Sequence, residues 1–263
     1  MGCVEHRGGQ TISYISPGWP SVRKTVDLDS YTIDKIESIL ALKKANPGLS
    51  KGAEIELISR QFLGVPYVAN RLIGSATIPE QLVIDFAALD CFTYLDYVEA
   101  LRRARTPNGF IRNLIRTRYA GGHVAFLKRK HFFSDWAYDR PALARDITAR
   151  ISPHAVSVSK VLNRKSFFGT YIAGLPDVKR TITYIPGRYV DRALLSRLRT
   201  GDYIGIYADE PGMDVTHVGI YVVTKDGPQL RNASSLKVNR KVVDSPFLDY
   251  VRNKPGIVVY RPR

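Results

Sequence analysis

The sequence predicts an α+β fold in which helices come first and an antiparallel sheet follows. Apolar residues recur at helical spacing before residue 153, whereas short β-rich runs divided by Gly, Pro and Asp dominate after it. This segregated order is typical of α+β domains, because alternating βαβ units would place helices between the strands. No repeat and no Pro/Ser-rich linker divides the chain. We therefore expect a single domain over residues 27–263, an irregular segment over residues 1–26 and a helical insertion at about residues 106–150.

Most of the expected helices lie in the first half of the chain. Their limits coincide with residues that favour helix boundaries, such as the cap residue Ser50 and Pro107 in a first turn. Residues 65–88 show no such periodicity and are expected to form loops and short extended pieces. The helices are expected at residues 30–44, 51–64, about 90–105 and 107–122, with a short one opened by Pro141.

The second half of the chain alternates between short apolar runs and turn residues, which predicts strands. One short helix, over residues 190–198, interrupts them. The strands are expected at residues 155–161, 181–185, 202–208, 215–224, 229–233 and 257–260.

Composition narrows the class of protein. The 263 residues are 44% hydrophobic and 24% charged, which is the mixture of an ordinary globular protein. Two cysteines provide neither a disulfide framework nor a four-thiolate zinc site, and no apolar run approaches the roughly 18 residues of a membrane span. These features exclude disordered, disulfide-rich and membrane-spanning classes.

The chain carries 39 Lys and Arg against 24 Asp and Glu, a formal net charge of +15. This excess favours anionic partners such as nucleic acid, acidic lipid or an anionic polymer. Nine basic residues and no acidic residue lie between Arg102 and Lys130. That stretch is either a solvated helix face or a docking surface for a polyanion.

The first three residues, Met1-Gly2-Cys3, contain neither the charged nor the apolar part of a secretion signal. Either the protein is cytosolic or a signal segment has been removed. A Gly directly before a Cys also suits the end of a bacterial lipoprotein signal. In that case Cys3 would be acylated and anchor the protein to lipid.

Cys91 is the first candidate catalytic residue. Asp90 is a suitable N-cap, so Cys91 falls in the first turn of the expected helix. Unpaired backbone N–H groups and the helix dipole favour a thiolate there, and we expect the thiol to ionise below pH 7. The alternative is a buried cysteine that acts as a small hydrophobic residue.

His217 and Asn232 are the second and third candidates. Alternation in the strand over residues 215–224 places Val218 on one face, and His217 and Gly219 on the other, where the small Gly leaves room for a group to approach. Asn232 lies on the following strand and is able to fix the tautomer of a neighbouring imidazole. The alternatives are a structural sheet histidine and a turn, edge or glycosylated asparagine. A helix-start Cys, a strand His and a polar orienting residue are the parts of a thiol acyl-transfer site.

Several short motifs resemble the DUF1460 family, described as N-acetylmuramoyl-L-alanine amidase-like, within the NlpC/P60 superfamily of papain-like cysteine peptidases. They occur in the family's order over about residues 55–263, and together they are more specific than any one of them. The motifs are Phe62-Leu63-Gly64-Val65-Pro66-Tyr67, Leu89-Asp90-Cys91-Phe92-Thr93, Arg129-Lys130-His131-Phe132-Phe133-Ser134-Asp135-Trp136, Gly201-Asp202, Thr216-His217-Val218-Gly219, Arg231-Asn232-Ala233-Ser234-Ser235 and Val259-Tyr260-Arg261-Pro262.

The resemblance implies a papain-like NlpC/P60 fold in which an antiparallel sheet packs against the helix that carries the nucleophile. It implies that Cys91 is the nucleophile, that His217 is the base and that Asn232 orients it, although this position is often His in the family. It also assigns a group of residues to the substrate or the oxyanion. These are Tyr67, Asp90, Arg231 and Ser234.

The implied function is cysteine-dependent hydrolysis of amides in peptidoglycan stem peptides, without metal or cofactor, by a monomer in the periplasm or cell envelope. N-acetylmuramoyl-L-alanine amidase specificity is one alternative, and an inactive cell-wall or polyanion-binding protein is another. No RRM, KH or zinc-finger pattern supports specific nucleic-acid binding. Asp214 and His217 are three residues apart, but no HExxH motif or Cys pair supports a metal amidase. The absence of a G-x-S-x-G elbow disfavours a serine hydrolase.

Overall fold

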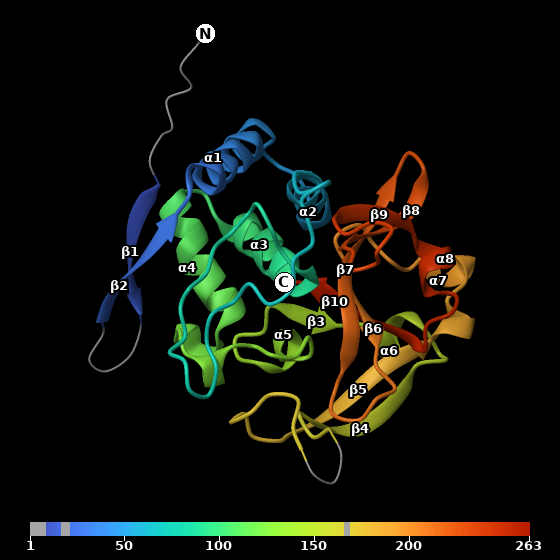
Figure 1. Ribbon diagram of the computed structural model, residues 1–263. Coiled ribbons are helices and arrows are strands. Elements are labelled where there is room, and N and C mark those ends of the chain that lie inside the picture. Colours follow the sequence, from blue (N-terminus) through green and yellow to red (C-terminus); the bar gives the residue numbers. More distant parts are fainter. Residues whose placement is uncertain (1–8, 17–21, 166–168) are drawn as a thin grey trace.

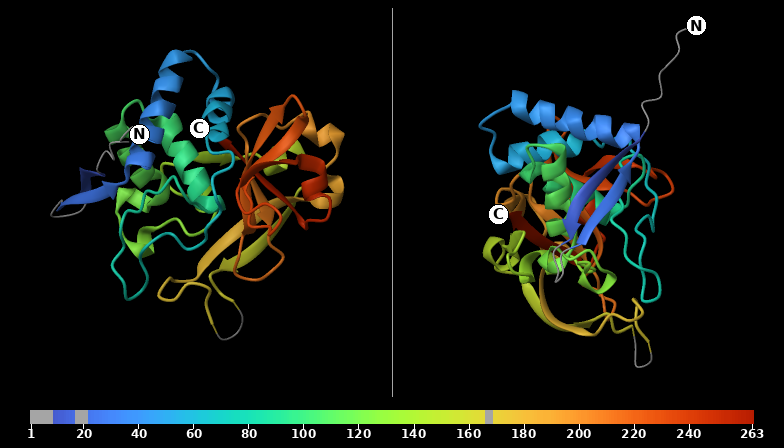
Figure 2. Two further views of the ribbon diagram at one scale, coloured as in Figure 1. Left: turned by 45° about the horizontal axis from the view of Figure 1, so that its top comes forward. Right: turned by 90° about the vertical axis from the view of Figure 1, so that its left-hand side faces the viewer.

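A computed structural model of the chain describes residues 9–16, 22–165 and 169–263. Figure 1 shows helices gathered on one side of an antiparallel sheet, and Figure 2 shows the same layers from two other directions. Cys3, the expected lipid anchor, lies outside the described residues.

Helices and strands follow each other largely as a helical half and a strand half. The helices are α1 (Ser30–Ala45), α2 (Lys51–Arg60), α3 (Cys91–Arg103), α4 (Pro107–Arg118), α5 (Asp135–Tyr138), α6 (Thr148–Ile151), α7 (Arg192–Leu195) and α8 (Phe247–Val251), with 3₁₀ turns η1 (Ala120–Gly122), η2 (Phe126–Lys128) and η3 (Gly187–Tyr189). The strands are β1 (Gln10–Ser16), β2 (Val22–Leu28), β3 (Ala144–Asp146), β4 (Val156–Leu162), β5 (Val178–Pro186), β6 (Tyr203–Tyr207), β7 (Val215–Thr224), β8 (Gly227–Ala233), β9 (Val242–Pro246) and β10 (Gly256–Pro262).

The main sheet of the described residues has eight strands in the order β4-β5-β10-β6-β7-β8-β9, with β3 paired to β10. Each neighbouring pair is antiparallel. The predicted α+β class with an antiparallel sheet is therefore confirmed.

Alternation along the strands gives the sheet two buried faces. Val218, Ile220 and Val222 of β7 pack into a cluster with residues of α1 to α4. Tyr221 of the same strand joins a second cluster on the other face, formed with α6, α7 and α8. The sheet is thus a middle layer, as the views in Figure 2 show.

Helix α3 is the centre of the helical layer and is buried from Thr93 to Arg102. It contacts α2 and α4 on its outer side and β7 and β8 on the other. Burial on all sides requires its acidic residues to have partners. Glu99 accepts from Arg102 at 2.8 Å and from the hydroxyl of Tyr203 in β6 at 2.7 Å, which ties the helix to the sheet.

The N-terminal segment differs from its expected irregular form. β1 and β2 pair in antiparallel register from Gln10↔Leu28 to Ser16↔Val22, and Figure 1 shows this two-stranded sheet beside the helices. Tyr14, Val26 and Leu28 are buried against the helical core. The apolar alternation that drives the pairing is short, and Gly and Pro residues around it obscured the pattern.

Two further expectations about elements are wrong. Pro141 does not open a helix, because the chain after it forms β3, whose residues pair with the C-terminal residues Tyr260–Pro262. The helix capped by Ser50 ends at Arg60 instead of Gly64. The insertion at residues 106–150 contains α4, α5 and α6, but also β3, so it is only partly helical.

The basic stretch from Arg102 to Lys130 is largely an internal ion-pair network. Its cations bind acidic residues that come from other parts of the chain or from the preceding turns of α3. The pairs are Arg102–Glu99, Arg103–Glu99, Arg105–Glu54, Arg118–Asp96, Arg129–Glu80 and Lys130–Asp139. Most of this charge is therefore committed to the fold, and the stretch is not the continuous polyanion surface that one reading of the sequence predicted.

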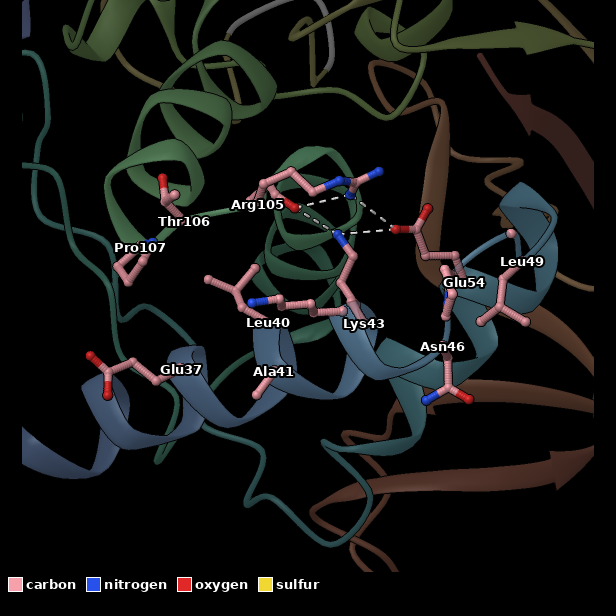
Figure 3. A pocket seen from close by; sticks show the side chains of 14 residues that line it. Glu37, Leu40, Ala41, Lys43, Asn46, Leu49, Glu54, Arg105, Thr106 and Pro107 are labelled. Carbon is pink, nitrogen blue, oxygen red and sulfur yellow. Dashed lines mark hydrogen bonds and ion pairs between the residues drawn. The ribbon is translucent and has the colours of Figure 1, made fainter.

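Lys43 of α1 closes the C-terminal end of α3. Its ammonium donates to the carbonyls of Leu101, Arg102 and Ala104, and it pairs with Glu54 of α2 at 3.1 Å. Figure 3 shows this arrangement inside a cavity of about 720 Å³ lined by α1, the α1–α2 loop and the α3–α4 turn. A cation at carbonyls that lack helical partners compensates the negative end of the helix dipole.

We predict that Lys43→Ala lowers the free energy of unfolding by about 2–4 kcal/mol, because it leaves the buried carbonyls at the end of α3 without their cation. Urea denaturation followed by circular dichroism measures the change. The matched control is Lys44→Ala, which removes an exposed neighbour. Equal stability of the two variants would show that Lys43 does not hold the helix end.

Candidate functional site

The site begins at the N-terminus of α3, where Asp90 and Thr93 form a reciprocal cap. The Asp90 carboxylate accepts from the backbone N–H groups of Phe92 at 3.1 Å and Thr93 at 2.8 Å, while the Asp90 N–H donates to the Thr93 hydroxyl at 2.9 Å. Such a capping box fixes the first turn of a helix. Cys91 is the first residue of that turn, as the sequence predicts.

The thiol of Cys91 is held in its neutral form. The residue is half-buried, but the sulfur lies deep enough that desolvation, followed by the negative charge of Asp90, raises its pKa to about 12. The backbone N–H groups of Val218, Cys91 and Phe92 act in the opposite direction but do not outweigh these effects. The expected ionisation below pH 7 is therefore contradicted for the resting site, because the cap that fixes the helix start also places a carboxylate beside the sulfur.

A β-bulge in β7 positions His217. Ile206 of β6 pairs with His217, whereas the next residue, Tyr207, pairs with Val215, so Thr216 is an extra residue in β7. Bulges of this kind bend a strand and redirect its side chains, and they are common beside active sites. His217 directly precedes Val218, whose N–H faces the Cys91 sulfur, so the bulge brings the histidine to the start of α3.

Asn232 of β8 fixes the tautomer of His217. The Asn232 side-chain N–H₂ donates to the Leu230 carbonyl at 3.0 Å, which leaves its oxygen facing the His217 Nε2 at 3.0 Å. A carbonyl oxygen only accepts hydrogen bonds, so Nε2 carries the proton and Nδ1 has a free lone pair. Burial lowers the pKa of His217, and nearby Lys254 lowers it further, so the imidazole is neutral.

Gly219 leaves space for the neighbouring strand β8 rather than for a ligand. A Cβ at this position would lie 2.8 Å from Leu230 Cδ1, 3.0 Å from the Arg231 carbonyl oxygen and 3.1 Å from the Asn232 Cβ. The room beside His217 that the sequence predicts is thus filled by residues of β8.

Tyr67, which the resemblance assigns to the substrate or the oxyanion, is held close to the start of α3. Its segment runs along the residues before Cys91: Val68 N–H donates to Leu89 O at 2.9 Å, and Tyr67 forms a parallel bridge with Leu89. Burial raises the pKa of Tyr67, and the charges of Cys91 and Asp90 raise it further.

Arg231 and Ser234, which the sequence assigns to the substrate or oxyanion, have structural contacts instead. Arg231 is buried, with its guanidinium bound to Asp244 at 2.7 and 2.8 Å and to Glu56 and Ser59 of α2. Side chains alternate along β8, so Arg231 points away from the face that carries Asn232. Ser234 is also buried, and its hydroxyl accepts from Leu236 and Asn239 in the β8–β9 loop.

Three residues near the thiol were not found by sequence reasoning. Tyr250 of α8 has its ring centroid 6.2 Å from that of His217, and burial together with the Cys91 charge raises its pKa to about 12. Arg240 lies over the Tyr67 ring, and Lys254 lies near His217 and over the Tyr250 ring. Arg240 lies in the β8–β9 loop, and Tyr250 and Lys254 lie in the five-residue helix α8 and the turn after it. Such segments show no hydrophobic periodicity in the sequence.

Asp214 does not join His217 in a metal site. Its carboxylate accepts from the backbone N–H groups of Ser134 at 2.6 Å and Val215 at 2.8 Å, in the interior. Among the described residues, no three His, Cys, Asp or Glu side chains are placed to hold a metal ion. The cavity in Figure 3 is also separate from the thiol, since it lies at the other end of the 13-residue helix α3, about 20 Å away.

The chain is similar in sequence to a known protein family. A model of the family described as AmiA-like, N-acetylmuramoyl-L-alanine amidase-like, matches residues 57–257. A comparison with curated proteins finds no match.

Solved structures share the fold. A structure described as an N-acetylmuramoyl-L-alanine amidase from Bacteroides uniformis is 28% identical, with a TM-score of 0.68, over 81% of this chain and 99% of that one. A Legionella pneumophila protein assigned to DUF1460 has a TM-score of 0.73 at 21% identity, over 88% and 95% of the two chains. A Bacteroides fragilis structure provisionally described as a xylanase is 27% identical, with a TM-score of 0.64, over 81% and 100%.

We predict that alkylation of Cys91 by iodoacetamide is slow at neutral pH. A pKa of about 12 leaves the thiol neutral over the range from pH 6 to 9. The thiolate fraction rises about tenfold per pH unit below the pKa, and the alkylation rate should rise with it. Peptide mapping in a Cys3→Ser background isolates the Cys91 adduct. A rate that reaches a plateau below pH 7 would contradict the neutral resting thiol.

Proposed function

This chain belongs to the AmiA-like family of N-acetylmuramoyl-L-alanine amidase-like proteins, and from that premise we propose that it hydrolyses amides of peptidoglycan stem peptides through Cys91. The observation that carries the proposal is the arrangement of Cys91, His217 and Asn232. A capped helix start carries the thiol, the bulged strand carries the imidazole one residue before Val218, whose N–H faces the sulfur, and the asparagine leaves Nδ1 as the acceptor. These are the parts of a thiol acyl-transfer site.

The first half of the reaction forms a thioester. Nδ1 of His217 takes the proton from the Cys91 thiol as the sulfur attacks the amide carbonyl carbon. The oxyanion is met by backbone N–H groups at the helix start, including that of Cys91. The His217 imidazolium then gives its proton to the amine as the carbon–nitrogen bond breaks, and the amine leaves.

The second half releases the acid. Water attacks the thioester while His217 Nδ1 takes its proton. The carbon–sulfur bond breaks, the imidazolium returns a proton to the sulfur, and a carboxylic acid leaves the site. Thiol and imidazole return to their neutral forms, so the cycle balances in protons.

In the resting site the Cys91 thiol and the His217 imidazole are both neutral, and this affects when the proton moves between them. The charge of Asp90 raises the pKa of the Cys91 thiol, but it also raises the pKa of His217. Asp90 therefore disfavours a free thiolate while stabilising the imidazolium that forms during attack. We infer that proton transfer accompanies attack on the substrate and does not precede it.

The order of helix Cys, strand His and polar residue on the next strand supports assignment to the papain-like NlpC/P60 peptidases. The bond proposed to be cleaved is the amide between N-acetylmuramic acid and L-alanine, in line with the family description. Peptidoglycan lies outside the cytoplasm, so we propose an extracytoplasmic, periplasmic location. In the described part of the chain, no helix has the length and apolar character needed to cross a membrane.

The site gives no support to glycoside hydrolysis. That reaction commonly uses two carboxyl groups about 5–10 Å apart that face the substrate. Asp90 is the carboxylate beside the thiol, and its Oδ1 is occupied by the N–H groups of Phe92 and Thr93 and by the Thr93 hydroxyl.

We predict that Cys91→Ala abolishes release of stem peptide from purified muropeptides, because the nucleophile is lost. Mass spectrometry of the products measures this, and the product mass identifies the bond. Circular dichroism and thermal melting should match the wild type, since alanine is accepted in a first helical turn. Undiminished cleavage by the variant would overturn the proposal. Loss of cleavage on addition of a chelator to wild-type protein would point to a metal amidase.

We predict that Asn232→Ala lowers kcat by roughly 10- to 100-fold with little change in KM, because the imidazole loses its fixed tautomer. General acid–base catalysis contributes about 10²–10⁴-fold to the rate, and the variant should lose part of that contribution. Asn232→His, which keeps a polar orienting group, should retain most of the activity. Asn108→Ala, at an exposed position in α4, is the control. Equal kcat values for wild type and Asn232→Ala would exclude an orienting role.

A further inference from the structure

Two cation–tyrosine pairs flank the Cys91 thiol. The Arg240 guanidinium carbon lies 5.3 Å from the centroid of the Tyr67 ring, and the Lys254 ammonium lies 5.5 Å from that of Tyr250. Tyr67 forms a bridge with Leu89, two residues before Cys91, and the Tyr250 ring centroid lies 6.2 Å from that of His217. Both cations therefore contact tyrosines that lie next to residues of the proposed site.

Arg240 and Lys254 have no acidic partner among the described residues. In contrast, Arg231 is bound to Asp244 and Glu56. Arg240 and Lys254 are exposed, and each makes a cation–π contact with its tyrosine. A tyrosine face orients a cation without neutralising it, so both remain available for an anion.

The backbone holds both cations in place. Arg240 has a φ of 48°, in the left-handed region that is uncommon for a residue with a Cβ. Its carbonyl accepts from Tyr67 N–H at 2.9 Å, and its N–H donates to Leu236 O at 2.9 Å. Lys254 N–H donates to Val251 O at 3.0 Å in the turn after α8. A strained backbone held by hydrogen bonds is often found where a side chain has a binding role.

We propose that Arg240 and Lys254 bind carboxylates of the substrate, so that the enzyme selects peptides with a free carboxylate close to the scissile amide. This inference rests on the proposed function and specifies its substrate class. From its tyrosine, each extended cationic side chain reaches about two residues along an extended peptide. Guanidinium binds a carboxylate through two parallel hydrogen bonds, and neither cation binds a neutral carboxamide comparably.

The test compares muropeptides that differ only by amidation of one carboxylate, at the D-glutamate or at the diamino acid. Wild-type kcat/KM should favour a free carboxylate by about 10- to 100-fold at one or both positions, as expected for a charged hydrogen bond. Arg240→Gln and Lys254→Gln should each remove one such preference, measured as the ratio of kcat/KM for the free and the matching amidated peptide, so that an effect of either variant on the catalytic step cancels. Arg240→Lys should retain part of the preference, because it keeps the charge.

The controls remove neighbouring exposed cations that do not contact the two tyrosines. They are Lys237→Gln in the loop of Arg240 and Arg252→Gln beside Lys254, and both should keep the wild-type preference. Cleavage that depends on Cys91 but does not distinguish free from amidated peptides would overturn this inference alone. Equal losses on free and amidated peptides in Arg240→Gln and Lys254→Gln would also overturn it. Absence of Cys91-dependent cleavage of every peptide would overturn the proposed function as well.

Discussion

The arrangement of this protein depends on a helix that is buried on every side, and a buried helix needs partners for its ends and its charges. Asp90 and Thr93 satisfy the N-terminus of α3, and Lys43 satisfies its C-terminus. Between the two ends, Glu99 is bound by Arg102 and by Tyr203 of the sheet. The helix is thereby fixed in position against β7 and β8, and Arg102, Arg103 and Arg118 serve this purpose by pairing with its acidic residues.

This constraint determines the chemistry available to Cys91. The residue occupies the first turn of α3, and its sulfur faces the N–H of Val218, the residue after His217 in the bulged strand. Burial and the capping carboxylate keep the thiol neutral, while Asn232 keeps the imidazole ready to accept a proton. Stability of the helix start and reactivity of the sulfur are therefore coupled through Asp90, which serves the first and restrains the second.

Features of the site that depend on neighbouring residues could be predicted from the sequence. The cap at Asp90, the position of Cys91 and the strand of His217 follow from residue types and short-range periodicity, and the structure places them as expected. Arg231 was misassigned because its partners, Asp244 and Glu56, are brought to it only by the pairing of β8 with β9 and the packing of α2. The thiol pKa was misjudged because burial depth is not visible in a sequence.

Other features depend on contacts between distant segments. Tyr67 and Arg240 meet through a backbone hydrogen bond across more than half of the chain, and Tyr250 reaches His217 from a helix too short to show a period. The β1–β2 sheet was missed because Gly and Pro residues mask a short alternation. Such features are set by tertiary packing, which overrides local propensity.

The central claim is that catalysis passes through a thioester on Cys91, and trapping that intermediate tests it most directly. Wild-type protein mixed with muropeptide is quenched in acid at successive times, digested and analysed by mass spectrometry. We expect the peptide that contains Cys91 to gain the mass of the acyl fragment, and we expect hydroxylamine to remove that added mass. Product formation with no added mass on that peptide at any time would contradict covalent catalysis at this cysteine.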